Sequence, residues 1–143
     1  MIEVEVLDRR APRSDVPPPA EIERLSLLAT AAAGVRDGHL AIEFVDSERI
    51  AQLNARFRGE RSPTDVLSFP VDGREALDDP GARELGDVVI CPDRARDVRE
   101  AVVHGVLHLC GMDHELDEGE MLCVQSELLR WEAADAEPLA AAG

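Results

Sequence analysis

The stretch that decides the fold runs from residue 88 to residue 111 and reads VVICPDRARDVREAVVHGVLHLCG. Its first four residues, 88–91, form a continuous apolar run, which is typical of a buried strand. Pro92 suits the first turn of a helix, and the helical pattern continues as far as Leu109. Gly111 can adopt a positive φ and end that helix. A buried strand followed by a helix predicts a sheet with helices packed on it.

Apolar periodicity extends this pattern to the rest of the chain. Alternating apolar residues predict further strands, and apolar stripes at helical spacing predict further helices. The expected strands are 2–7, 40–44 and 65–69, and the expected helices are 20–33, 47–57 and 118–132. Ser47 is expected to cap the second helix, residues 58–64 to form a loop, Pro70 to end the third strand, and 72–84 to be an exposed acidic loop.

These elements predict an α+β fold. We expect a single domain over residues 1–132, with an about four-stranded mixed sheet packed with about four helices. Residues 133–143 are small and acidic, and we expect them to form a flexible tail.

The charge and composition exclude several classes of protein. Thirty acidic residues against fifteen arginines give a net charge of -15, which opposes non-specific binding to nucleic acid or to anionic lipid. Aromatic residues make up only 3% of the chain, so recognition of bases by stacking is disfavoured. The three cysteines form no C-x-x-C pair; we expect Cys110 to face the core and Cys91 and Cys123 to be buried. We expect His39 to be an isolated surface residue. No signal peptide or membrane span is apparent. We expect a cytoplasmic protein with no DNA and no membrane partner.

Positive charge is concentrated in one segment of the first half. Residues 49–61 contain four arginines against one acidic residue, Glu60. Three of these arginines, Arg56, Arg58 and Arg61, are candidate phosphate-binding residues, because guanidinium groups bind phosphate well. Residues 72–143 carry eighteen acidic residues and only six arginines, which favours a basic protein as their partner.

Three of the four histidines have the spacing of a metal site. His104 and His108 are four residues apart on the predicted helix, so they share one face. A reversal at Gly111 can return His114 to the same place. Three imidazole nitrogens and one open position make a common catalytic zinc geometry. We therefore predict one zinc ion per chain on this helix, held by His104, His108 and His114.

The same spacing occurs in the zinc-protease signature H-E-x-x-H-x-x-G-x-x-H. Gly105 stands where that signature has its glutamate, which is the general base of the protease. The missing carboxylate argues against a protease. We also expect the absent side chain to leave room beside His104 for a bulky substrate.

The segment from His104 to His114, HGVLHLCGMDH, resembles the H-G-x-L-H-L-x-G-y-D-H motif of the YbeY family of bacterial rRNA maturation factors. Two further blocks are similar to that family. They are Leu53-Asn54 with Phe57-Arg58-Gly59 and PTDVLSFP at 63–70, and LGDVVIC at 85–91. The resemblance runs from about residue 42 to about residue 125.

The resemblance implies a single-strand-specific, metal-dependent endoribonuclease. Such an enzyme acts in 3′-end maturation of small-subunit (16S) rRNA and in late ribosome quality control, so its implied partners are this RNA and the small ribosomal subunit or its proteins. The resemblance also implies that His104, His108 and His114 are zinc ligands and that Arg58 contacts substrate, with Arg58 and His114 as catalytic residues. Asp113 either hydrogen-bonds a ligand imidazole or is an ordinary turn residue.

Two other functions remain open at this point. One is a non-catalytic ribosome assembly factor with a structural zinc site. The other is a zinc hydrolase of another substrate, such as a protease. For the nuclease, the motif contains no evident general base, so either water or the ribose 2′-hydroxyl can be the attacking group.

Overall fold

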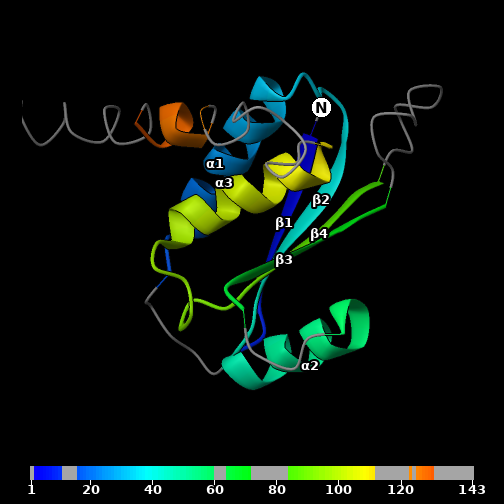
Figure 1. Cartoon of the computed structure of the whole chain (residues 1–143). Coiled ribbons are helices and arrows are strands. Elements are labelled where there is room, and N and C mark those ends of the chain that lie inside the picture. Colours follow the sequence, from blue (N-terminus) through cyan, green and yellow to red (C-terminus); the bar gives the residue numbers. More distant parts are fainter. Residues whose placement is uncertain are drawn as a thin grey trace, which may run out of the picture.

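The structure is a computed structural model of the chain, and it describes residues 2–10, 16–59, 64–71, 84–111, 123 and 125–130, except for the side chain of Arg58. Four strands and three helices follow one another along these residues (Figure 1). They are β1 (Ile2–Asp8), α1 (Pro19–Ala32), β2 (Gly38–Phe44), α2 (Ser47–Arg58), β3 (Val66–Pro70), β4 (Glu84–Ile90) and α3 (Val98–Leu109).

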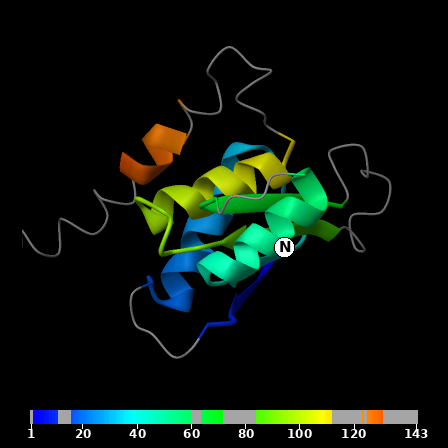
Figure 2. The same cartoon turned by 60° about the horizontal axis from the view of Figure 1, so that its bottom comes forward.

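The four strands form one mixed sheet in the order β1-β2-β4-β3. β1, β2 and β4 are parallel neighbours, and β3 pairs antiparallel with β4 at the edge. Helices α1 and α3 cover one face of the sheet, and α2 lies on the opposite face (Figure 2). This arrangement confirms the predicted α+β class and the mixed four-stranded sheet.

Residues 125–130 are helical and supply a further part of the predicted fourth helix. Leu128 from this segment is only 8% exposed and belongs to the core between the sheet and helices α1 and α3. The predicted start of this helix at residue 118 and the predicted tail, 133–143, lie outside the described residues. No helix in the described part of the chain is long and apolar enough to cross a lipid bilayer.

Two helix starts differ from the sequence-based expectation. α3 begins at Val98 and not at Pro92, because the Asp97 carboxylate accepts hydrogen bonds from the backbone N–H groups of Arg99 and Glu100. α2 is capped by Asp46 and not by Ser47, since the Asp46 side chain accepts from the Arg49 N–H at 2.8 Å. In both cases an aspartate supplies the acceptor that the first turn of the helix needs.

The edge hairpin is longer than predicted. β4 begins at Glu84, inside the segment expected to be a loop, and Pro70 is the last residue of β3 instead of a residue beyond it. Pro70 pairs with Gly86. A proline is tolerated there because β3 is an edge strand, where a missing N–H leaves no neighbour unsatisfied.

Gly105 brings α3 close to the sheet. A Cβ atom at this position would lie 2.4 Å from Cγ1 of Val88 and 3.3 Å from Cγ2 of Val66. The Ser68 hydroxyl donates a hydrogen bond to the Gly105 carbonyl oxygen at 3.1 Å. Gly105 is therefore buried against β3 and β4, and the expectation that it leaves space for a bulky substrate is wrong. The glycine is needed for helix–sheet packing.

Candidate active site

The two histidines of α3 lie together, as their spacing predicts. The Nε2 atoms of His104 and His108 are 3.2 Å apart, and the ring centroids are 4.7 Å apart. Both side chains are partly buried. Their neighbours on the helix, Val103, Gly105 and Leu107, are buried, so the backbone beneath the two rings is fixed by the core.

A buried amide and a carboxylate continue from His104. The Nδ1 atom of His104 lies 2.8 Å from Oε1 of Gln125, and Nε2 of Gln125 donates to Oε1 of Glu100 at 3.3 Å. Gln125 is 6% exposed, and Glu100 lies one turn before His104 on α3. Four side chains, Glu100, Gln125, His104 and His108, therefore form one hydrogen-bonded chain.

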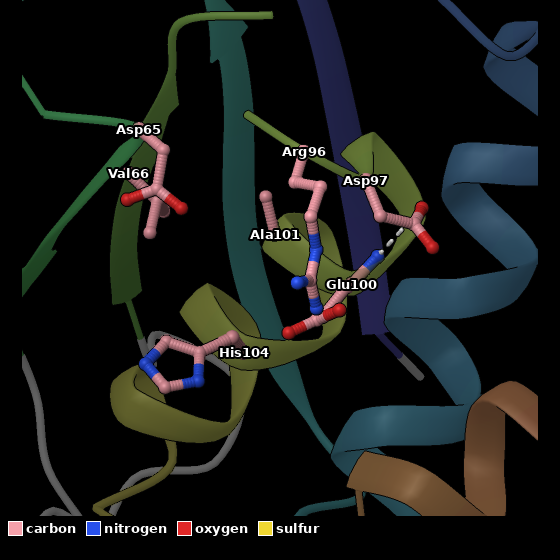
Figure 3. A pocket seen from close by; sticks show the side chains of 7 residues that line it. All are labelled: Asp65, Val66, Arg96, Asp97, Glu100, Ala101 and His104. Carbon is pink, nitrogen blue, oxygen red and sulfur yellow. Dashed lines mark hydrogen bonds between the residues drawn. The ribbon is translucent and has the colours of Figure 1, made fainter. Parts of the chain in front are cut away.

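A cavity of about 150 Å³ opens beside His104, between the start of β3 and the first turns of α3 (Figure 3). Its lining residues are Asp65, Val66, Arg96, Asp97, Glu100, Ala101 and His104. Figure 3 shows Arg96 from the segment just before α3, Glu100 from the first turn of α3, and His104 further along the helix. Small-molecule sites usually measure roughly 300–1,000 Å³, so this cavity suits a phosphate-sized group.

The donor set fits a metal ion. Two nitrogens held at roughly 2.0–2.1 Å from one tetrahedral ion are about 3.3 Å apart, close to the separation of the two Nε2 atoms. No group of three histidine, cysteine or acidic side chains that could hold a metal occurs among the described residues. The predicted third ligand, His114, and its neighbour Asp113 lie outside that set.

The arginines predicted to bind phosphate are described only in part. Arg58 is the last residue of α2 and not a loop residue, because the helix continues to Gly59, which caps it with a φ of 74°. Arg56 is exposed on the same helix, with its guanidinium 5.3 Å from the ring centre of Phe57. Arg61 lies outside the described residues.

Sequence patterns missed three residues of this site. Gln125 is 21 positions from His104, so no local spacing indicates their contact. Glu100 and Arg96 lie in the segment before the histidines, and no sequence motif marks either residue. A buried glutamine on an apolar helix face was the one available signal, because buried amides need partners.

Cysteine and histidine positions outside the site divide into correct and wrong expectations. Cys110 is buried in the main core, which confirms that it faces away from the histidine pair, and Cys91 is buried as expected. Cys123 is exposed, although a buried position was expected. His39 was expected to be an isolated surface residue, but it lies 2.8 Å from the Glu84 carboxylate.

Comparison with known proteins gives one consistent match. The family model described as "Endoribonuclease YbeY" matches residues 21–131. A protein named Endoribonuclease YbeY from Macrococcus caseolyticus is 35% identical over 148 residues, covering 90% of this chain and 94% of its own. A protein of the same name from Bacillus licheniformis is 39% identical, and the alignment covers 77% of this chain and 82% of that protein. The protein of this name from Rubrobacter xylanophilus is 45% identical, and the alignment covers 66% of this chain and 67% of that protein.

The fold also has a solved counterpart. A Thermotoga maritima protein, determined in solution, is similar with a TM-score of 0.57 and 24% sequence identity. The likeness covers 94% of this chain and 92% of that protein. It supports the observed strand and helix arrangement.

Proposed function

The chain belongs to the YbeY endoribonuclease family, and we propose that it is a single-strand-specific, metal-dependent endoribonuclease. We propose that it matures the 3′ end of small-subunit (16S) rRNA and takes part in late ribosome quality control in the cytoplasm. The single structural observation that supports this function best is the pair of His104 and His108 Nε2 atoms, 3.2 Å apart beside a phosphate-sized cavity.

In this proposal, His104, His108 and His114 hold one zinc ion per chain. When bound, zinc supplies Lewis-acid chemistry for attack on a phosphodiester. Arg58, with Arg56 and Arg61, binds the phosphate and offsets the charge that develops on it. Asp113 either orients a ligand imidazole or serves as a turn residue. The P–O bond to the leaving group breaks, and the attacking oxygen comes from water or from the ribose 2′-hydroxyl.

The cavity adds a further cation to this arrangement. Arg96 lines it together with His104, and the carboxylates of Asp65, Asp97 and Glu100 line it as well. These acidic groups disfavour phosphate anywhere in the cavity except next to Arg96 and the proposed metal. Substrate is therefore held by a few contacts around one phosphate.

The test of catalysis uses two variants with matched controls. His108→Ala and Arg58→Glu should abolish cleavage of single-stranded rRNA while leaving association with the small subunit intact. His39→Ala, at the remaining histidine of the sequence, and Arg49→Glu, an exposed arginine on the same helix as Arg58, should cleave at wild-type rates. Full cleavage by His108→Ala would exclude the proposed site. Absence of cleavage by the wild-type protein would favour the non-catalytic assembly factor.

The protease alternative lacks structural support. The position of the protease glutamate is occupied by Gly105, and a side chain there would collide with Val88 of β4. The site therefore has no place for the protease general base.

Weak binding to free RNA is a second expected property. If Arg56, Arg58 and Arg61 each neutralise one phosphate of a single strand, log affinity falls against log salt with a slope of about 2. We expect ribosomal particles to bind much more tightly than naked rRNA fragments, because a basic ribosomal protein can meet the acidic second half of the chain. Affinities for both, measured at two salt concentrations, check this; tight naked-RNA binding with a steep slope would contradict it.

A further inference from the structure

We propose that Gln125 is a positioning residue that holds His104 as its Nδ1–H tautomer, so that the Nε2 lone pair points toward His108. The idea rests on the proposed function, because that lone pair is the one needed for metal binding. Nothing in the histidine motif marks Gln125. It reaches the site from the helical segment 125–130, which packs on α3.

The donor and the acceptor of each hydrogen bond follow from the carboxylate of Glu100, which lies at one end of the hydrogen-bonded chain. Oε1 of Glu100 accepts from Nε2 of Gln125, so the amide presents its NH₂ group to this carboxyl group. The Gln125 oxygen is then the atom facing His104, and it too can only accept. His104 must therefore carry its proton on Nδ1, and its Nε2 is left with a lone pair. That lone pair lies 3.2 Å from Nε2 of His108.

Burial makes this arrangement costly to disturb. Gln125 is 6% exposed, and an amide at that depth loses free energy if its oxygen or its NH₂ group has no partner. Glu100 and His104 are four residues apart on α3, and one amide bridges both side chains. Leu128, on the same segment as Gln125, is buried in the main core and holds that segment in place.

Gln125 therefore has two separable roles. It satisfies a buried contact, which affects stability, and it selects one tautomer of His104, which affects the nitrogen that faces a metal. Partners of this kind around a ligating histidine usually change metal affinity by roughly 10- to 100-fold when removed. A purely structural glutamine would change stability without changing the tautomer.

The first experiment measures the tautomer directly in the full-length, metal-free protein. Long-range ¹H–¹⁵N NMR correlations distinguish Nδ1–H from Nε2–H imidazole, and pH 8 lies above the usual histidine pKa of about 6.5. The wild-type protein should show Nδ1–H at His104. Gln125→Leu should show a mixture, whereas Gln52→Leu, the same change at an exposed glutamine of α2, should match wild type. An Nε2–H tautomer at His104 in the wild type would overturn the proposal.

The second experiment measures Zn²⁺ affinity by competition with a chelator. Gln125→Leu should weaken binding by about 10- to 100-fold. Glu100→Ala should weaken it less, and the double variant should match Gln125→Leu alone, because Glu100 acts through Gln125. If the losses of Zn²⁺ affinity from the two substitutions add in the double variant, Glu100 does not act through Gln125 and this part of the proposal is overturned.

A rescue variant separates positioning from packing. Exchanging the two groups, as Gln125→Glu with Glu100→Gln, puts a carboxylate at position 125 that accepts from His104. The new amide at position 100 can then donate its NH₂ group to that carboxylate. This double variant should regain Zn²⁺ affinity to within about threefold of wild type and should restore the Nδ1–H tautomer. If the folded double variant regains neither the Zn²⁺ affinity nor the Nδ1–H tautomer, the proposal is contradicted.

The outcomes also separate this inference from the proposed function. If the wild-type protein binds no Zn²⁺ and cleaves no RNA, the proposed function fails whatever tautomer His104 adopts. If the wild type binds Zn²⁺ and cleaves RNA, but Gln125→Leu does so equally well with an unchanged tautomer, only the role of Gln125 fails.

Discussion

The two faces of the sheet are built differently. The face under α1 and α3 carries a core cluster of eighteen buried residues among those described, and the face under α2 carries a cluster of five. The histidine pair stands above the larger cluster, on α3. The buried side chains of α3 anchor the backbone beneath the two imidazoles, whose Nε2 atoms are 3.2 Å apart, so the pair lies on the face with the larger core cluster.

The opposite face tolerates charge where α2 does not cover it. Strand alternation places Glu5, His39, Glu43 and Asp87 on that side. His39 lies 2.8 Å from Glu84 and 3.7 Å from Glu5, which offsets part of the repulsion among the acidic groups. The contrast shows that the histidine pair lies on the face with the larger buried cluster, and that the other face is polar where α2 does not cover it.

The largest expected effect comes from the same leucine-to-alanine change made on the two faces of the sheet. Leu107→Ala, in α3 and its core cluster, should cost more stability than Leu67→Ala, in β3 on the face that α2 covers, although both leucines are buried. Leucine-to-alanine changes cost roughly 2–5 kcal/mol, and the cost is greatest where the surroundings cannot collapse. We expect Leu107→Ala in the upper half of that range and Leu67→Ala in the lower half, measured by urea unfolding. Equal losses would mean that the two faces are equally rigid.

The next effect compares two glycines. Gly105→Ala should destabilise by about 1–3 kcal/mol through overpacking against Val88. It should also disturb the histidine pair, lowering Zn²⁺ affinity. Gly59→Ala meets no atom within 4 Å and costs about 1 kcal/mol through its φ of 74° alone. Thermal unfolding and Zn²⁺ titration of both variants check this, and unchanged Zn²⁺ affinity in Gly105→Ala would contradict the link between packing and site.

The smallest effect tests the polar face. Asp87 is exposed on the polar face, but partial desolvation raises its pKa above the ordinary 3.8, and the neighbouring carboxylates of Glu84 and Glu43 raise it further, against a lowering by His39. The folded state then binds this proton more tightly than the unfolded state, so stability falls as pH rises from about 3.8 through the raised pKa. At neutral pH the folded state carries the full loss of stability that comes from ionising Asp87.

Asp87→Asn should therefore raise the melting temperature at pH 7, and this gain should disappear as the pH falls below about 3.8. The control is Glu23→Gln, which removes the same charge from an exposed position on α1. Calorimetry of both variants at the two pH values measures the difference. An equal gain from the control would assign the effect to net charge instead of to the desolvation and the acidic neighbours of Asp87.

Local features of this chain were predictable because their causes are local. Alternation in 2–7 and the stripe in 20–33 indicate their strand and helix, which the structure confirms as β1 and α1 within one or two residues. The i, i+4 spacing of His104 and His108 indicates that their rings share a helix face, and Gly111 has the predicted positive φ of 93°. Helix geometry alone relates these residues to one another.

The tertiary structure decided what depends on distant segments. Sequence alone determined a helix that presents two histidines, because 3.6 residues per turn fix that relation whatever the helix packs against. Only the folded chain brings Gln125 to His104, Ser68 to the Gly105 carbonyl and Val88 into the space that a side chain at 105 would occupy. Such contacts arise from the joint packing of α3, β3, β4 and the segment 125–130, and no spacing along the chain encodes them.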